Sequence, residues 1–484
     1  MNETTEAVGK RFTPSGTRWY WPIVFRSLGQ SLQGPRLFVG LLMIIIFMAA
    51  GSVWDGVSPV KMQQSELQGN IPSDPVSVLL NSIHGNTFQS GISVFDDKDI
   101  EQLQNQKDLT IGQFRKALLE KWEARKDKLL LQIPQARDKK ERERLTSLLD
   151  KYRNNTGYLL NMADRYEPKP VFYYTVTSLR HAGLTVVNGF WTMSPAAAWA
   201  GIGEAWGEIN ILLKKIWSGH KVFSVVFALI LVFLWCIGGG AISRMTALDM
   251  TRGKSIRASE GLGFTLAKLA DLLLGLFLFP LLAVFFGIII AVIWGVLLRF
   301  PGLNVLGGIL YVIALLLGLL MVLISVGFLG SFSLMIPAVA VESSDAYDSQ
   351  QRAYAYLLAR PGLLLLYTAL ALLQGIIAVT LLWLILLWTL NLTAWLASLI
   401  GGGEVITMAG GLEQLAEQKP LWMLSGSEHL TGIIIGVWRY LAAGMVGAFI
   451  ISFYFSSQTI IYLLMRRAVD GEEIEKQVTP EPAG

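Results

Sequence analysis

The sequence predicts an all-α, polytopic transmembrane helical bundle of six spans with an extracytoplasmic, mainly helical domain, and three observations predict it. Of 484 residues, 53% are hydrophobic and only 16% are charged, with a mean hydropathy of +0.48. A soluble protein needs about 25% charged residues to cover its surface. Long apolar runs recur, several of them long enough to cross ~30 Å of hydrocarbon. One long polar section, residues 55–221, separates the first run from the others.

The N-terminal segment, residues 1–36, is basic and precedes the first apolar run, residues 37–54. Positive charge collects on the cytoplasmic side of membrane helices, so we expect this segment to be cytoplasmic. A cleaved signal peptide is the alternative. The run starts too late and is too long for that interpretation.

Residues 110–163 predict a helical hairpin within the outer domain. Phe114, Leu118 and Trp122 recur at helical spacing, and Pro134 interrupts the pattern. Two amphipathic helices with a break between them favour an antiparallel pair. Acidic residues are interleaved with the basic ones, which indicates a solvated surface and no nucleic-acid partner.

Residues 195–217 predict an amphipathic helix that starts at Ser194 and Pro195. Its apolar stripe carries Trp199 and Trp206. Such a stripe just before a span favours a helix lying in the headgroup plane of the membrane. The alternative is that the stripe packs onto the outer domain.

The remaining chain predicts two pairs of spans and a sixth span. Arg244 and Arg252 follow the second span, so that end is cytoplasmic and residues 55–221 lie outside. Gly238–Gly240 would loosen this helix or admit a close neighbour. A short re-entrant element in the outer loop stays an open alternative. The predicted order is a cytoplasmic segment 1–36, a first span 37–54, an extracytoplasmic domain 55–221 with hairpin 110–163 and interfacial helix 195–217, paired spans 222–298 and 309–390, an outer loop 391–432, a sixth span 439–465 and a cytoplasmic tail 466–484.

Two cytoplasmic links, residues 241–273 and 331–362, share one order of features. A span ends, a polar segment follows, then a basic surface helix, then the next span. Arg257 and Lys268 bound the first surface helix, and Arg352 and Arg360 bound the second. We expect Ser344 and Asp345 to cap the second helix and its apolar side to carry Tyr347, Tyr354 and Leu358. Weak internal repetition is common in transport folds, although a duplicated bundle need not transport anything.

Three stretches carry a resemblance: GGAISRMTALDMTRGKSIRASEGLGF, PAVAVESSDAYDSQQRAYAYLLARPG and SSQTIIYLLMRRAVDG. Together they resemble a bacterial family of uncharacterised multi-pass proteins, over roughly residues 235–471. The second stretch is also similar to the membrane domain attached to some glycerophosphoryl diester phosphodiesterases. The resemblance implies a shared helical membrane bundle. The catalytic barrel of those enzymes has no counterpart here, so the resemblance implies no enzymatic activity.

No catalytic, cofactor or metal site is predicted. The four histidines, His84, His181, His220 and His429, do not stand at metal-ligand spacing, and Cys236 is the single cysteine. Neither a phosphate-binding glycine pattern nor a nucleophile elbow occurs. We therefore expect a protein that is not an enzyme and holds no cofactor.

Charged and polar groups at membrane depth are the candidate site residues, because a charge in hydrocarbon costs about 2.5–3.5 kcal/mol on insertion scales. Asp271 is expected to pair with Lys268 on the helix surface. Glu342 is expected to pair with Arg352 or Arg360 and so fix the surface helix to the bundle. Arg439 is expected to be an outer-interface anchor that snorkels. A polar patch in the sixth span predicts interhelical hydrogen bonds or, alternatively, the lining of a polar cavity: Ser456, Ser457, Gln458 and Thr459.

Two functional hypotheses follow, besides that of a lipid-modifying enzyme, for which no catalytic constellation is visible. The first is a non-enzymatic scaffold or envelope-complex subunit of the cell inner membrane, whose partners are the lipid bilayer and other membrane or envelope proteins. The alternative is a permease or channel-like transporter component with a path between the repeated helix pairs.

Overall fold

The computed structural model describes residues 20–58, 61–62, 110–136, 138–166, 169–192, 194–399 and 427–474, with five single residues between positions 79 and 103. Within this part the protein is almost entirely helical, which confirms the predicted all-α class. The strands described are β1 (Lys61–Met62) and β2 (Lys169–Pro170), which pair antiparallel.

Six helices are long and apolar enough to cross a membrane, and they identify a multi-pass membrane protein. A helix rises 1.5 Å per residue, so the shortest of them, with 24 residues, reaches about 36 Å. These helices begin and end up to 12 residues away from the predicted spans: α3 (Gly34–Val57), α11 (Lys221–Arg252), α13 (Leu269–Arg299), α15 (Tyr311–Glu342), α17 (Pro361–Ser398) and α20 (Ser427–Asp470).

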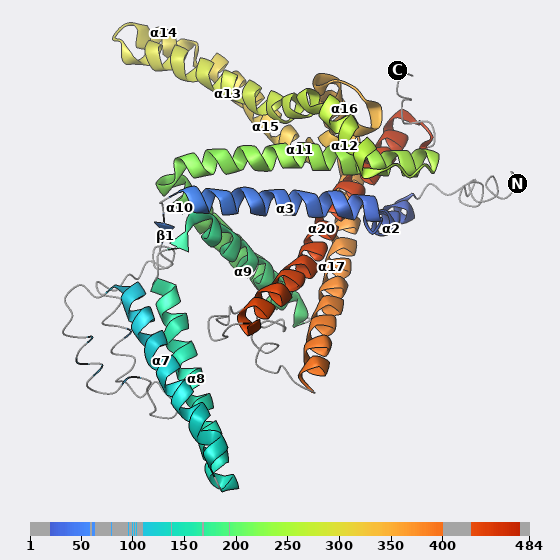
Figure 1. The fold of residues 1–484 in the computed structure, drawn as a ribbon. Coiled ribbons are helices and arrows are strands. Elements are labelled where there is room, and N and C mark those ends of the chain that lie inside the picture. The colour runs from blue at the N-terminus through green and yellow to red at the C-terminus, as the bar shows by residue number, and fades with distance from the viewer. Residues whose placement is uncertain are drawn as a thin grey trace, which may run out of the picture. The chain divides into compact units, whose positions relative to one another are not determined.

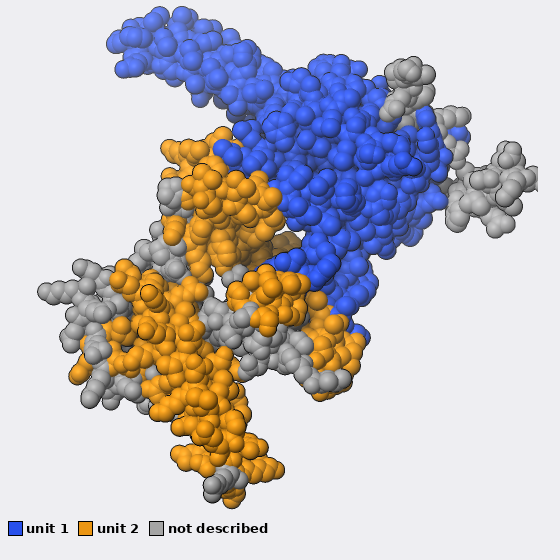
Figure 2. Space-filling model, in the orientation of Figure 1, with its two compact units in different colours: residues 1–47, 226–389, 437–484 blue, residues 48–225, 390–436 orange. Residues whose placement is uncertain are grey.

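The chain forms two compact units, shown in Figure 2. Unit 1 contains residues 1–47, 226–389 and 437–484, and unit 2 contains residues 48–225 and 390–436. All four boundaries fall inside long helices, namely α3, α11, α17 and α20.

Unit 1 contains both predicted links. In the first, α12 (Ala258–Ala267) lies between Arg257 and Lys268, as expected, and leads into α13. In the second, α16 (Ala346–Ala359) leads into α17. The short helices η2 (Trp21–Phe25) and α2 (Arg26–Ser31) precede α3, and α14 (Leu303–Ile309) joins α13 to α15, which run side by side (Figure 1).

The second surface helix differs from its prediction in two respects. Asp345 caps it, as expected, by accepting a hydrogen bond from the backbone N–H of Asp348, but the helix then begins at Ala346, so Arg352 lies in mid-helix and does not open it. Its buried side carries Ala346, Ser349, Gln350, Ala353 and Tyr356. Of the predicted apolar side, Tyr347 and Leu358 are exposed, whereas Tyr354 is half-buried and packs against Phe279 of α13 and Gly327 of α15.

Gly238–Gly240 admit close neighbours while α11 stays an unbroken helix. A Cβ atom at Gly238 would meet Met43 of α3, one at Gly239 would meet the ring of Phe455 of α20, and one at Gly240 would meet Thr265 of α12. Three successive glycines point in three directions around a helix, so each accommodates a different element. Of the two expectations for these glycines, close packing is the one the structure shows.

Unit 2 contains the predicted hairpin. Its helices are α7 (Ile111–Gln135) and α8 (Lys139–Tyr166), and α7 begins with a capping box between Thr110 and Gln113. The hairpin core is formed by apolar side chains at steps of three and four, with single residues of the preceding segment packed against it: Leu79, Phe95, Leu103, Phe114, Leu118, Trp122, Leu129, Leu149, Leu159, Leu160 and Ala163.

A second hairpin in unit 2 is formed by α9 (Val171–Trp191) and α10 (Pro195–Gly219) (Figure 1). Ser194 caps α10, with Pro195 in the first turn, so the predicted start of this helix is confirmed. No sequence argument placed a helix at residues 171–191. The possible re-entrant element in the outer loop falls largely on residues 400–426, outside the described residues.

Candidate functional site

Several charged side chains gather around one buried carboxylate where α15, α16 and α20 meet, within unit 1. Glu342 is the last residue of α15, and its side chain is only 5% exposed. Its carboxylate lies 2.8 Å from Nη1 of Arg352 on α16 and 3.3 Å from Nη1 of Arg466 on α20. The hydroxyl of Tyr462, also on α20, donates a hydrogen bond to the same carboxylate. A buried carboxylate requires such partners, because an unpaired charge would be expensive to remove from water. We call these four residues the Glu342 junction.

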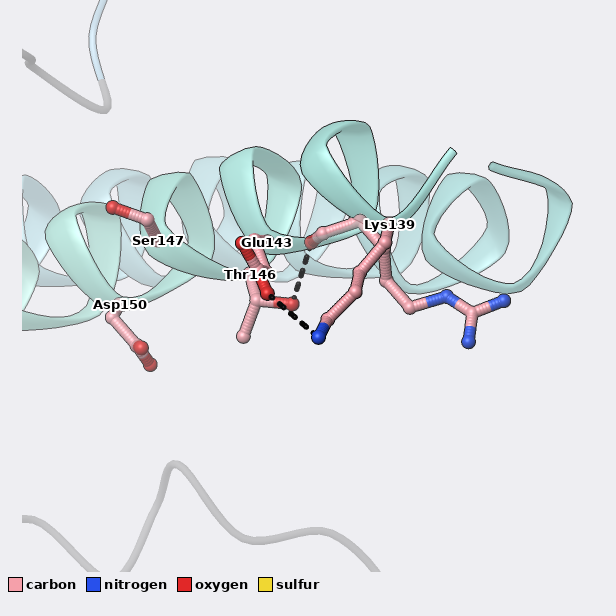
Figure 3. Close-up of a pocket in the computed structure, with 6 residues that line it drawn as sticks. Lys139, Glu143, Thr146, Ser147 and Asp150 are labelled. Atoms are coloured by element: carbon pink, nitrogen blue, oxygen red, sulfur yellow. Dashed lines mark hydrogen bonds and ion pairs between the residues drawn. The ribbon is translucent and has the colours of Figure 1, made fainter. Parts of the chain in front are cut away.

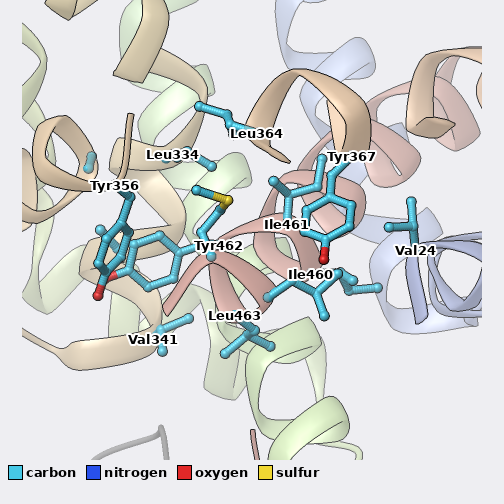
Figure 4. Packing of buried hydrophobic residues seen from close by; sticks show 14 of the residues in the cluster. Val24, Leu334, Val341, Tyr356, Leu364, Tyr367, Ile460, Ile461, Tyr462 and Leu463 are labelled. Atoms are coloured by element: carbon cyan, nitrogen blue, oxygen red, sulfur yellow. The ribbon is translucent and has the colours of Figure 1, made fainter. Parts of the chain in front are cut away.

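Two further carboxylates extend the Glu342 junction. The Tyr356 hydroxyl donates a hydrogen bond to Asp470 at 2.5 Å, and Arg466 Nη2 lies 2.7 Å from Glu472. The rings of Tyr356 and Tyr462 lie next to each other in Figure 4, with centroids 5.5 Å apart. Arg466 thus contacts a second carboxylate, and Tyr462 packs against a tyrosine that is hydrogen-bonded to another.

The surroundings of the junction keep Arg352 charged and Tyr356 protonated. Burial raises the pKa of Tyr356, and the hydrogen bond to Asp470 and the negative charge of Asp470 raise it further. Burial lowers the pKa of Arg352, but the attraction of Glu342 and the other acidic neighbours outweighs it, so the net pKa is raised. Arg352 is therefore a permanent cation and Tyr356 a permanent hydrogen-bond donor at neutral pH.

Arg244 supports the same end of α15 from α11. Its side chain is 2% exposed, and Nη1 donates to the carbonyl of Ala340 at 2.9 Å and to Oγ of Ser343 at 3.4 Å. The guanidinium also lies 4.4 Å from the ring centroid of Phe264 on α12. The last carbonyls of a helix lack partners within the helix and carry partial negative charge, so a cation there is stabilising. Ser343 ends the helix in a left-handed conformation, φ 54°.

Arg36 forms a similar group of buried polar contacts between α3 and α11. Its side chain is 1% exposed and lies 3.1 Å from Asp249, which also accepts a hydrogen bond from Gln33 at 2.7 Å. Arg36 further donates to the backbone carbonyls of Gln30 and Met245. Buried arginines with multiple acceptors thus connect α2, α3, α11 and α15.

The structure brings together some of the predicted site residues. Glu342 and Arg352 form the expected pair, and Lys268 and Asp271 form theirs at 3.0 Å. Arg360 is the exposed C-cap residue of α16. Arg439 is 7% exposed and its guanidinium lies 5.2 Å from the ring centroid of Tyr440, so its side chain is packed within the protein and does not extend to water as a snorkelling anchor would.

The polar patch of α20 is buried and largely engaged in helix packing. Ser456 Oγ lies 3.1 Å from Thr246 Oγ1 on α11. Ser457 and Thr459 donate to carbonyls of their own helix, which is the usual arrangement for a hydroxyl inside a helix. Within the described residues, Oε1 of Gln458 has no hydrogen-bond partner.

Sequence reasoning missed four contributors to these junctions: Arg36, Arg244, Tyr462 and Arg466. In the sequence, arginines near the ends of spans indicate only the cytoplasmic side. One signal could have found two of them, because Tyr462 and Arg466 are four residues apart and share one face of a helix. The acceptors of Arg244 are backbone carbonyls, for which the sequence carries no signal.

The hairpin of unit 2 contains an open hollow along α8, lined by Lys139, Arg142, Glu143, Thr146, Ser147 and Asp150 (Figure 3). Lys139 lies 4.0 Å from Glu143. The lining mixes both charge signs, and among the described residues no group of three or more His, Cys, Asp or Glu side chains could hold a metal ion. The hollow is therefore a polar surface of mixed charge along α8.

Comparison of the chain with protein-family models, with curated proteins and with solved structures finds no match.

Proposed function

We propose that the protein is a non-enzymatic scaffold of the cell inner membrane, whose bundle anchors an extracytoplasmic domain, residues 55–221, that binds another membrane or envelope protein. The observation that carries this proposal is the α7–α8 hairpin. It has its own hydrophobic core and a surface dense in charge, in contrast to the membrane helices, which are poor in charge.

The surface of the hairpin is suited to a protein partner. Its two helices carry thirteen basic and seven acidic side chains, which favours an acidic partner surface. Leu130 and Leu131, near the end of α7, are 45% and 68% exposed among these charges. An exposed apolar pair surrounded by charge has the composition of a small binding centre with a polar rim.

The hydrogen bonds and ion pairs of the buried polar groups also favour a scaffold. Ser456 bonds to α11, and the Glu342 junction holds three helices together. These groups have the partners that fixed helix packing requires.

The experiment is site-specific photo-crosslinking in native membranes with the full chain. A crosslinker at Leu131 is expected to capture one discrete protein, and Leu130→Asp together with Lys128→Glu is expected to abolish that product. The matched position is Lys116, which is exposed near the other end of α7 and is expected to give at least tenfold less of it. Equal capture at both positions, or capture that survives the substitutions, would contradict the scaffold.

A permease or channel-like component, with a path between the repeated helix pairs, is the second candidate. Gln458 favours it, because its buried Oε1 lacks a partner among the described residues and a transported polar molecule could supply one. Conductance across a planar bilayer containing the purified protein would support this candidate if Gln458→Leu removed it and left the protein folded.

A further inference from the structure

Helix α10 presents a tryptophan-bearing face that the rest of unit 2 does not cover. Trp199, Trp206 and Trp217 are 77%, 67% and 61% exposed. They are separated by seven and eleven residues, which places them on one face of a helix. Ile202 and Leu213 are exposed on the same face. We call these five residues the tryptophan face.

The α9–α10 hairpin does not need the tryptophan face for its own packing. Ala205, Leu212 and Ile216 are the buried side chains of α10 and lie on a different side of the helix. A Cβ atom at Gly201 would lie 2.9 Å from the carbonyl oxygen of Thr185, and one at Gly189 would lie 2.7 Å from that of Ala197. The two helices therefore pack backbone to backbone through small residues, and the large rings remain outside.

Both ends of this hairpin are attached to membrane helices. The Asp55 carboxylate at the end of α3 accepts hydrogen bonds from the backbone N–H groups of Phe172 and Tyr173, at 3.0 and 2.9 Å, and so caps the start of α9. At the other end, His220 alone separates α10 from α11. The ring centroids of Trp54 and Phe223, at these same ends of α3 and α11, lie 5.6 Å apart. The hairpin thus starts and finishes beside the neighbouring ends of two candidate membrane helices.

We propose that the tryptophan face of α10 binds the surface of the bilayer in which the protein is embedded, with its rings at the level of the lipid headgroups. Tryptophan is enriched at this depth because its ring is apolar and its N–H can bond to the headgroup region. Amphipathic helices bind there through an apolar face, with basic side chains near anionic phosphates. Lys214 is exposed beside Leu213 and Lys221 opens α11, which places cations where such phosphates would lie. Trp217 lies four residues before α11 begins, so the tryptophan face ends close in the chain to a candidate membrane span.

The test uses the full chain with Cys236→Ser in nanodiscs of phosphatidylcholine and phosphatidylglycerol, and spin labels at single cysteines. The variants are Trp206→Cys on the tryptophan face and Glu204→Cys, an exposed position two residues away and on a different side of α10. We expect the label at 206 to collide at least threefold more with oxygen than with a water-soluble nickel complex, and the label at 204 to show the reverse.

Two outcomes would overturn the proposal. Collision with the nickel complex at both positions would show that the tryptophan face lies in water. Exclusion of both reagents at 206 would show that protein covers it, and dipolar broadening between labels would then identify the cover as a second copy. Trp199→Cys repeats the measurement at a site two turns away, so that a local effect of one substitution cannot decide the result.

Discussion

The hydroxyl of Tyr462 donates a hydrogen bond to Glu342, a residue 120 positions earlier in the chain. This contact joins the last described membrane helix, α20, to the end of α15, and Arg466 repeats it one turn later. Because Arg352 approaches the same carboxylate from α16, one acidic group fixes the mutual position of three helices.

Glu342→Gln is expected to lower the free energy of unfolding by about 3 kcal/mol, the lower end of the range for removing one partner of a buried ion pair, since Arg352 is partly exposed. Unfolding by SDS in mixed micelles measures this. Glu472→Gln is the control, because Glu472 is about half exposed and its loss is expected to cost under about 1 kcal/mol. Equal losses for both variants would show that Glu342 has no special role.

Stability is expected to fall as the pH rises above about 10, the ordinary pKa of tyrosine. Burial and Asp470 raise the pKa of Tyr356 in the folded state, so the unfolded chain loses this proton first and alkaline pH favours unfolding. Below that pH the contribution is fully present. Tyr356→Phe is expected to make the decline between pH 9 and 11 shallower. The measurement is the melting temperature of the unsubstituted protein and of Tyr356→Phe at several pH values in this range. Melting temperatures that fall in parallel would contradict the prediction.

Gly239→Ala is expected to destabilise the protein by about 1–3 kcal/mol, because its Cβ atom would collide with the ring of Phe455. Gly263→Ala on α12 is the matched control. Nothing lies within 4 Å of the added atom there, and alanine favours a helix by roughly 0.5–1 kcal/mol over glycine. The two substitutions should thus change thermal stability in opposite directions.

Asp55→Ala is expected to destabilise the start of α9 by about 1–2 kcal/mol through loss of its cap. Hydrogen exchange should accelerate at the amides of Phe172 and Tyr173 and stay unchanged in α7. Asp55→Asn retains an acceptor and should have a smaller effect. Unchanged protection at both amides in the alanine variant would refute the capping role.

Gln458→Leu is expected to leave stability unchanged or to raise it slightly, because the substitution removes a buried oxygen that lacks a partner among the described residues. Ser457→Ala should also be nearly neutral, since its hydroxyl bonds only within α20. Ser456→Ala should cost about 1 kcal/mol, because it removes the bond to Thr246. Thermal melting of the three variants, compared side by side, tests this order.

The membrane helices and the α7–α8 hairpin were predictable because their signals are local. A span needs only a long apolar run, and the hairpin follows from the spacing of Phe114, Leu118 and Trp122. Helix α9 was not predictable in this way. It depends on the cap from Asp55, more than 110 positions away, and on the contact of Gly189 with α10.

The Glu342 junction likewise has one part that local sequence predicts and another that depends on contacts between distant residues. Glu342 and Arg352 lie ten positions apart, on either side of one short link, so their pairing could be expected. Tyr462 and Arg466 come from a helix whose position against α15 depends on the whole bundle. Where α20 lies could not be read from its own residues.

The position of Tyr462 and Arg466 also has a consequence for biosynthesis. Translation proceeds from the N-terminus, so α15 and α16 leave the ribosome before the residues that complete the Glu342 junction exist. In the nascent chain Glu342 has Arg352 on α16 as its first cationic partner, and Arg466 reaches it only after α20 has been inserted. The first membrane helix, α3, depends on α20 in the same way. Gly40 of α3 packs closely against Ala448 of α20, and this contact forms only after α20 has been synthesised. Insertion of α20, and not of any earlier helix, is therefore the step at which this bundle can close.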